Sequence, residues 1–162
     1  MLPSESRCDV LEWRAVGLSI RLPQSHIVET QGGLHTAKQT IRTNRAPKPG
    51  GVYSQGIKLP SGILYTAGVG PIDPATGQIV GTSVQDQTRQ VLANLTAIVE
   101  AAGLTMHDVV KTTVYLQHLE RDFAEFNQAY SDFFSPPYPV RTTVGAKLNK
   151  ILVEIDLVAQ AD

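Results

Sequence analysis

The sequence predicts an α+β fold in which a single β-sheet carries two helices packed on one of its faces. Two long segments, 83–102 and 121–134, have apolar residues spaced as on one side of a helix. Short alternating segments stand ahead of, between and after these helices, as strands do. This order of elements is typical of one sheet with both helices on the same side. The other face needs a cover, and association with further copies of the chain is the simplest one.

The first strands are predicted as a hairpin. Residues 50–59 and 63–69 alternate between apolar and polar or small side chains, and Pro60-Ser61-Gly62 between them has the composition of a turn. A second turn is indicated at 71–77, where proline, aspartate, threonine and glycine follow closely.

Both predicted helices have recognisable ends. Ser83 is a favourable N-cap with Asp86 three residues later, a variant of the capping box, and Gly103 suits the position after the last turn. Pro136-Pro137 stops the second helix. The apolar stripe of that helix is aromatic and consists of Phe123, Phe126, Tyr130, Phe133 and Phe134.

Three further strands are predicted, at 109–118 between the helices and at 140–147 and 151–158 after them. Residues 1–39 lack such patterning. We therefore expect them to form an N-terminal extension that is flexible or foreign to the core, with residues 40–162 forming the domain.

Composition and motif content speak against several classes of protein. The net charge of −1 is unlike that of a general nucleic-acid binder, and no run approaches the ~18–20 apolar residues of a membrane span. The single cysteine, Cys8, excludes an internal disulfide, and the four histidines lack metal-ligand spacing. A cytoplasmic location is favoured. Mitochondrial targeting by residues 1–39 is less favoured, because acidic residues interrupt the segment.

One pair of charged residues stands inside the two apolar C-terminal strands. Arg141 opens the strand at 140–147, and Glu154 interrupts the strand at 151–158. If their faces coincide, a guanidinium suited to bidentate carboxylate binding shares a cleft with a carboxylate that can orient water. Spacing alone favours the alternative of an ordinary salt bridge on a solvated face. For Asn127, an amide on the aromatic stripe, a backbone cap and a site role stand equally open.

A series of ordered segments between about residues 44 and 159 then carries a family resemblance. They are Val52-Tyr53-Ser54-Gln55-Gly56, Leu64-Tyr65-Thr66-Ala67-Gly68, Gln87-Thr88-Arg89-Gln90-Val91-Leu92-Ala93-Asn94-Leu95, Val109-Val110-Lys111-Thr112-Thr113-Val114-Tyr115-Leu116, Pro139-Val140-Arg141-Thr142-Thr143-Val144 and Leu152-Val153-Glu154-Ile155-Asp156. On these segments the chain resembles the RidA family, also called YjgF or endoribonuclease L-PSP.

The resemblance implies a chorismate-mutase-like fold of the bacillus type and a homotrimer with a site at each subunit interface. It also implies a 2-iminobutanoate/2-iminopropanoate deaminase, which hydrolyses enamine and imine intermediates such as 2-aminoacrylate and 2-iminobutanoate to 2-keto acids and ammonia. No cofactor or metal is implied. By position, Arg141 would bind the substrate carboxylate and Glu154 would position the attacking water. The substrate-binding residues that the resemblance implies are Tyr53, Gly68, Asn127, Arg141 and Thr143, with Gly68 and Thr143 acting through backbone groups.

Three departures from the family pattern bear on substrate preference. Thr143 stands where many members have cysteine, Val69-Gly70 replaces the usual glutamine, and the loop at 148–150 is about two residues shorter than the common form. Two other functions stay open. One is an endoribonuclease or translation inhibitor of the L-PSP type, which the absence of net basicity and of a histidine pair speaks against. The other is a non-catalytic trimer that binds small molecules.

Overall fold

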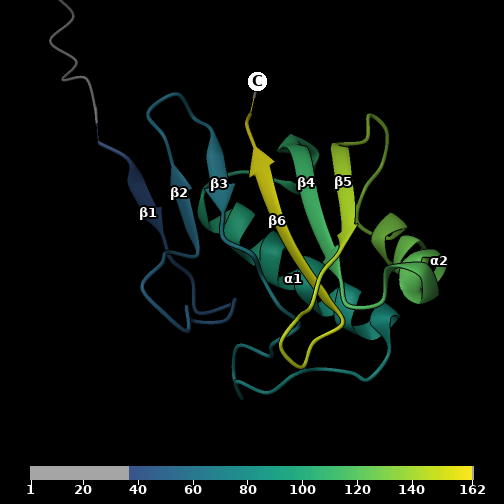
Figure 1. Cartoon of the computed structure of the whole chain (residues 1–162). Coiled ribbons are helices and arrows are strands. Elements are labelled where there is room, and N and C mark those ends of the chain that lie inside the picture. The colour runs from purple at the N-terminus through teal and green to yellow at the C-terminus, as the bar shows by residue number, and fades with distance from the viewer. Residues whose placement is uncertain (1–36, 162) are drawn as a thin grey trace, which may run out of the picture. The chain divides into compact units, whose positions relative to one another are not determined.

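The computed structural model describes residues 37–161, which contain one six-stranded sheet in the order β1-β2-β3-β6-β4-β5 (Figure 1). The expectation that residues 1–39 form an extension falls almost wholly outside this range and stays a prediction. The strands are β1 (Gln39–Ile41), β2 (Gly56–Lys58), β3 (Leu64–Thr66), β4 (Val109–Leu116), β5 (Val140–Gly145) and β6 (Val153–Ala159).

The predicted hairpin is present, but its strands are much shorter than the alternating segments. β2 and β3 pair antiparallel, and Gly62 turns the chain between them with a φ of 90°. Residues 50–54 do not join the sheet, because their backbone bonds locally: the Gly50 N–H donates to the Tyr53 hydroxyl at 3.0 Å, and the Tyr53 N–H donates to the Gly51 carbonyl at 3.0 Å.

The first predicted helix is confirmed as α1 (Val84–Ala101). The Ser83 hydroxyl accepts from the Asp86 N–H at 3.1 Å, and Gly103 follows the helix with a φ of 75°. The turn at 71–77 is confirmed as well. There the Asp73 carboxylate accepts backbone N–H groups two and three residues ahead, which lowers the pKa of that carboxyl.

The second helix, α2 (Leu119–Ser131), connects β4 to the parallel strand β5, and β6 then returns antiparallel between β3 and β4. Its bounds lie two to three residues earlier than the predicted range of 121–134. A short 3₁₀ helix, Met106–Asp108, precedes β4.

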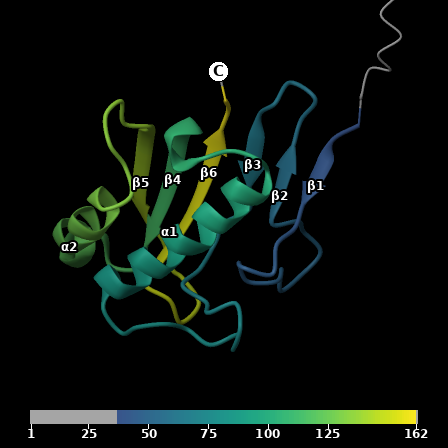
Figure 2. The same cartoon turned by 180° about the vertical axis from the view of Figure 1, so that it is seen from behind.

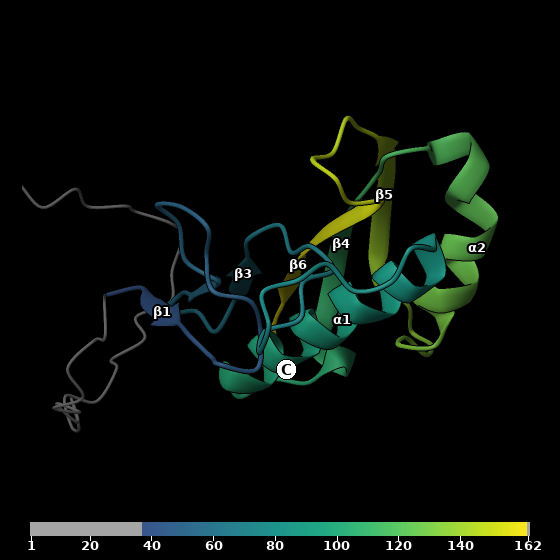
Figure 3. The ribbon, with the colours of Figure 1, turned by 90° about the horizontal axis from the view of Figure 1, so that it is seen from below.

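Both helices cover one face of the sheet, as predicted. Figure 2 views the molecule from the helix side, and Figure 3 shows α1 and α2 next to each other. Every second residue of β6, from Val153 to Ala159, is buried beneath the helices. The opposite face leaves large apolar side chains exposed, namely Tyr65, Val140 and Val144. No helix in the described part of the chain has the length and apolar character to cross a membrane.

Candidate active site

Arg141, on β5, is held against the aromatic stripe of α2. Its guanidinium carbon lies 4.8 Å from the centre of the Tyr130 ring, 5.3 Å from that of Phe126 and 5.9 Å from that of Phe123. These distances are within the range of cation–π attraction. Among the described residues no carboxylate pairs with Arg141, so its N–H donors are free for a ligand. From the sequence these rings were predicted only as the apolar stripe of the helix.

Tyr130, which contacts the guanidinium of Arg141, is itself held by the sheet. Its hydroxyl shares a hydrogen bond of 2.8 Å with the buried Thr112 hydroxyl of β4. Burial raises the pKa of the Tyr130 phenol, and the bond from Thr112 and the positive charge of Arg141 offset only part of that effect. The ring therefore stays neutral and presents an uncharged face to the guanidinium.

Asn127 and Thr143 flank the same corner of the fold. Asn127 follows Phe126 on α2, and its side chain forms no hydrogen bond within residues 37–161, so the backbone cap considered from the sequence is not seen. Thr143 lies two residues after Arg141 on the same face of β5, and its hydroxyl oxygen is buried without a hydrogen-bond partner. Both groups thus have unused hydrogen-bonding capacity near the free guanidinium.

Glu154, on β6, approaches a second site residue, Gly68. The backbone of Val69 bridges to Ile155 by two hydrogen bonds of 2.9 and 3.2 Å, which draws the neighbouring Gly68 against Glu154. A Cβ atom at position 68 would overlap the Glu154 carboxylate oxygen Oε1. A side chain at position 68 would therefore have to displace the Glu154 carboxylate.

Glu154, Gly68 and Tyr53 line one open cavity of about 900 Å³. The loop that carries Tyr53 is fixed by Gln55, which is 5% exposed. The Gln55 amide donates to the carbonyls of Thr43, Ala46 and Pro47 at 2.8–3.2 Å and accepts from the Thr43 N–H at 2.8 Å. Sequence reasoning missed this role, for which the only signal was an amide between alternating strand residues.

The strand register separates the two charged residues, so the condition that their faces coincide is not met within one chain. Arg141 pairs with Thr112 of β4, whereas Glu154 pairs with Tyr115 of the same strand. Thr112 and Tyr115 are three positions apart, and side chains an odd number of positions apart point to opposite faces. Arg141 therefore lies on the helix side and Glu154 on the uncovered side.

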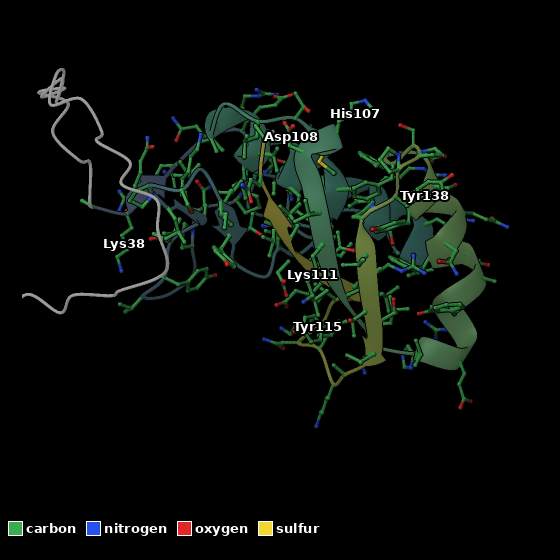
Figure 4. The ribbon with its side chains drawn as sticks, turned by 90° about the horizontal axis from the view of Figure 1, so that it is seen from above. Lys38, His107, Asp108, Lys111, Tyr115 and Tyr138 are labelled. Atoms are coloured by element: carbon green, nitrogen blue, oxygen red, sulfur yellow. The ribbon has the colours of Figure 1, made fainter. Side chains whose placement is uncertain are left out.

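The uncovered face around Glu154 is polar near the strand centre. Lys111 and Tyr115 of β4, labelled in Figure 4, lie on this face, and the Lys111 ammonium donates to the Thr113 hydroxyl at 3.2 Å. In the part of the chain that the structure describes, no group of three histidine, cysteine or acidic side chains is arranged to hold a metal ion.

Comparison with known proteins shows which family the chain is similar to. The family model of endoribonuclease L-PSP matches residues 43–161. A RutC family protein of Pyrococcus horikoshii is 48% identical over 124 residues, which are 75% of this chain and 97% of that protein. A protein of Escherichia coli named as a reactive intermediate deaminase, TdcF, is 43% identical over 127 residues, covering 75% of this chain and 96% of its own.

Solved structures of related proteins have the same fold. A crystal structure of Escherichia coli TdcF with bound serine superposes with a TM-score of 0.71 at 40% identity, covering 76% of this chain and 99% of the other. The structure of RidA from an Antarctic Psychrobacter species gives a TM-score of 0.72 at 38% identity, with coverage of 76% and 99%. These matches confirm the chorismate-mutase-like α+β fold that the sequence resemblance implied.

Proposed function

Because this chain belongs to the endoribonuclease L-PSP family, which includes RidA and TdcF, we propose that it hydrolyses reactive 2-imino acids and their enamine forms to 2-keto acids and ammonia. The substrates we propose are small ones, such as 2-aminoacrylate and 2-iminobutanoate. The observation that carries the proposal is the guanidinium of Arg141, which lies on an aromatic support without an ion-pair partner among residues 37–161 and is suited to a substrate carboxylate.

The chemistry requires little beyond positioning. The C=N carbon of an imino acid is electrophilic, so a water oxygen bonds to it while the nitrogen takes a proton. The resulting carbinolamine then expels ammonia and leaves the keto group. Arg141 fixes the carboxylate, and Glu154 orients the water and accepts its proton. Tyr53 and Asn127 line the pocket, and Gly68 and Thr143 supply backbone groups. No cofactor is part of this proposal.

This site needs two copies of the chain. Since Arg141 and Glu154 lie on opposite faces of one sheet, they can meet only where the helix-side corner of one chain faces the uncovered side of another. A homotrimer with three such interfaces fits this requirement, because a head-to-tail contact closes into a ring. The serine bound by TdcF has a carboxylate next to a carbon that bears nitrogen, as a 2-imino acid does, which supports the choice of ligand.

The test is ammonia release from freshly generated 2-iminobutanoate, measured for the wild type, three site variants and one control variant. Arg141→Ala removes the carboxylate anchor, so kcat/KM should fall at least about tenfold, whereas Arg141→Lys should restore little. Glu154→Gln keeps the shape but weakens the orientation of water, so kcat should fall more than KM rises. Arg89→Ala, which breaks only an exposed pair with Asp132, is the matched control.

Four results would contradict the proposal. Wild-type turnover by Arg141→Ala would remove the anchor role, and an effect of Glu154→Gln on KM alone would remove the water-positioning role. Binding of 2-keto acids without ammonia release would indicate the non-catalytic binder instead. RNA cleavage that is lost together with Arg141 or Glu154 would favour the endoribonuclease. The cytoplasmic location stays a prediction.

A further inference from the structure

Two buried amide side chains interrupt the apolar stripe of α1. Gln87 is 3% exposed and Asn94 is 1% exposed. The two residues are seven positions apart, which places both on the same side of the helix. Positions of this kind normally carry apolar residues. A buried amide is costly unless its hydrogen bonds are made, so the partners of these two show what the amides are there to hold.

Asn94 holds the chain that follows Gly68. Its Nδ2 donates to the carbonyl of Ile72 at 2.8 Å and to that of Gly70 at 3.2 Å, and its Oδ1 accepts from the Gln90 side chain at 2.9 Å. Gly70 and Ile72 both line the Glu154 cavity, and Gly70 lies two residues after Gly68.

Gln87 holds the chain that precedes Glu154. Its Oε1 accepts the N–H of Leu152 at 2.7 Å, and its Nε2 donates to the carbonyl of Gly81 at 3.2 Å. Leu152 lies directly ahead of β6, two residues before Glu154, and its neighbour Ile151 is part of the cavity lining. Each amide therefore fixes backbone two residues away from one partner of the Gly68–Glu154 contact.

We infer that Gln87 and Asn94 are positioning residues, through which α1 sets the place of the Glu154 carboxylate relative to Gly68 and the water it orients. The inference rests on the proposed function. A displacement of the order of 1 Å at a reacting centre can cost about 100-fold in rate. A small movement of the backbone next to Gly68 or next to Glu154 should therefore lower kcat. Neither amide bonds to Arg141 or to the rings of α2 that hold it, so KM should change little.

The experiment uses the full chain and compares Asn94→Asp, Asn94→Ala and Gln87→Ala with the matched control Thr88→Val. Thr88 is buried on the same helix, but its hydroxyl donates only to the Val84 carbonyl within that helix. Two readouts are taken. The first is kcat and KM for 2-iminobutanoate from pH 6 to pH 9. The second is hydrogen exchange of the segments 68–74 and 148–156, measured by mass spectrometry.

Asn94→Asp provides a signature that general destabilisation does not share. Its carboxylate faces two carbonyl oxygens and cannot donate to either, whereas the protonated acid restores one of the two bonds. We expect kcat at pH 9 to fall at least about tenfold and to recover in part, relative to wild type, as the pH approaches 6. Asn94→Ala and Gln87→Ala should lower kcat without such recovery. Exchange should quicken in the nearby segment alone, and Thr88→Val should leave both readouts unchanged.

The outcomes separate this inference from the proposed function. If the wild type releases no ammonia from the imine, the proposed function fails. Hydrogen exchange of the segments 68–74 and 148–156 then still decides whether the two amides hold these segments in place. Exchange equal to that of the wild type, or faster exchange throughout α1, β4 and β6 alike, would overturn the inference. A kcat that is unchanged despite locally faster exchange would overturn it as well.

Discussion

Gly68 and Glu154 approach each other so closely that a side chain at position 68 must displace the carboxylate. We predict that Gly68→Ala lowers kcat for imine hydrolysis while the folded state keeps most of its stability, because the group that gives way is the flexible end of Glu154 and not the backbone. Steady-state kinetics and urea unfolding measure the two quantities. Normal activity in this variant would show that the Glu154 carboxylate works from another position.

Gly62→Ala is the complementary control. Gly62 has a φ of 90° in the hairpin turn and no atom lies within 4 Å of its added Cβ, so the substitution is strained without meeting a neighbour. It should cost about 1 kcal/mol of stability and leave kcat unchanged.

Tyr130 gives the molecule a pH dependence of known sign. Burial raises the pKa of its phenol above the ordinary value near 10, so the neutral form is favoured in the folded state. The stability that this contributes is fully present below about pH 10 and is lost as the pH rises through the folded-state pKa. We predict that wild-type stability falls above pH 10 more steeply than that of Tyr130→Phe.

Urea unfolding at fixed protein concentration between pH 8 and pH 11 measures both curves. At pH 8 the Tyr130→Phe variant should be less stable by about 1–3 kcal/mol, because the buried hydroxyl of Thr112 loses its partner. Parallel curves above pH 10 would show that Tyr130 does not titrate there and that the alkaline loss comes from other groups.

At the scale of elements, α1 depends on its first turn. The Ser83 hydroxyl both accepts from the Asp86 N–H and donates to the Asp86 carboxylate at 2.7 Å. Ser83→Ala should therefore lower the free energy of unfolding by about 1 kcal/mol, and the melting temperature by roughly 3–6 °C, without changing KM. Calorimetry at constant protein concentration tests this, and a shift below 1 °C would mean that packing alone fixes the start of the helix.

The elements were predictable to different degrees for physical reasons. The helix α1 and the turn after β2 depend on local chemistry, namely the Ser83 cap and the positive φ of Gly62, and the sequence displays both. The range 50–59 was misjudged because the hydroxyl and the N–H of Tyr53 bond to backbone of the same loop instead of a neighbouring strand. Alternation alone does not distinguish the two cases.

The candidate site was predictable in its residues but not in its geometry. Arg141 and Glu154 could be selected as charges within apolar strands, and alternation gave the face of each within its own strand. Their mutual arrangement depends on how each pairs with β4, and a register is set by long-range contacts that a single strand does not contain. The bonds of Gln87 to Leu152 and of Asn94 to Ile72 were hidden for the same reason, since these partners lie 65 and 22 residues away along the chain.

At the scale of the whole molecule, the proposed function requires subunit association, because Arg141 and Glu154 lie on opposite faces of the sheet. The exposed Tyr65, Val140 and Val144 on the helix-free face are the kind of apolar surface that such an association would cover. Light scattering at micromolar concentration should therefore give three times the chain mass, and dilution that dissociates the trimer should remove activity.

Mixed assemblies provide the sharpest test of a shared site. Arg141→Ala chains retain Glu154, and Glu154→Gln chains retain Arg141. An interface is therefore intact where an Arg141→Ala chain supplies the glutamate and a Glu154→Gln chain supplies the arginine. In a head-to-tail ring of three, every mixed trimer contains one such interface. Folding the two variants together in equal amounts should therefore restore about a quarter of the wild-type sites, because about three quarters of random trimers are mixed. Ammonia release measures the recovery, and the variants mixed after folding serve as the control. Inactivity of the co-folded mixture, with mixed trimers verified by two different tags, would show that Arg141 and Glu154 do not combine across an interface.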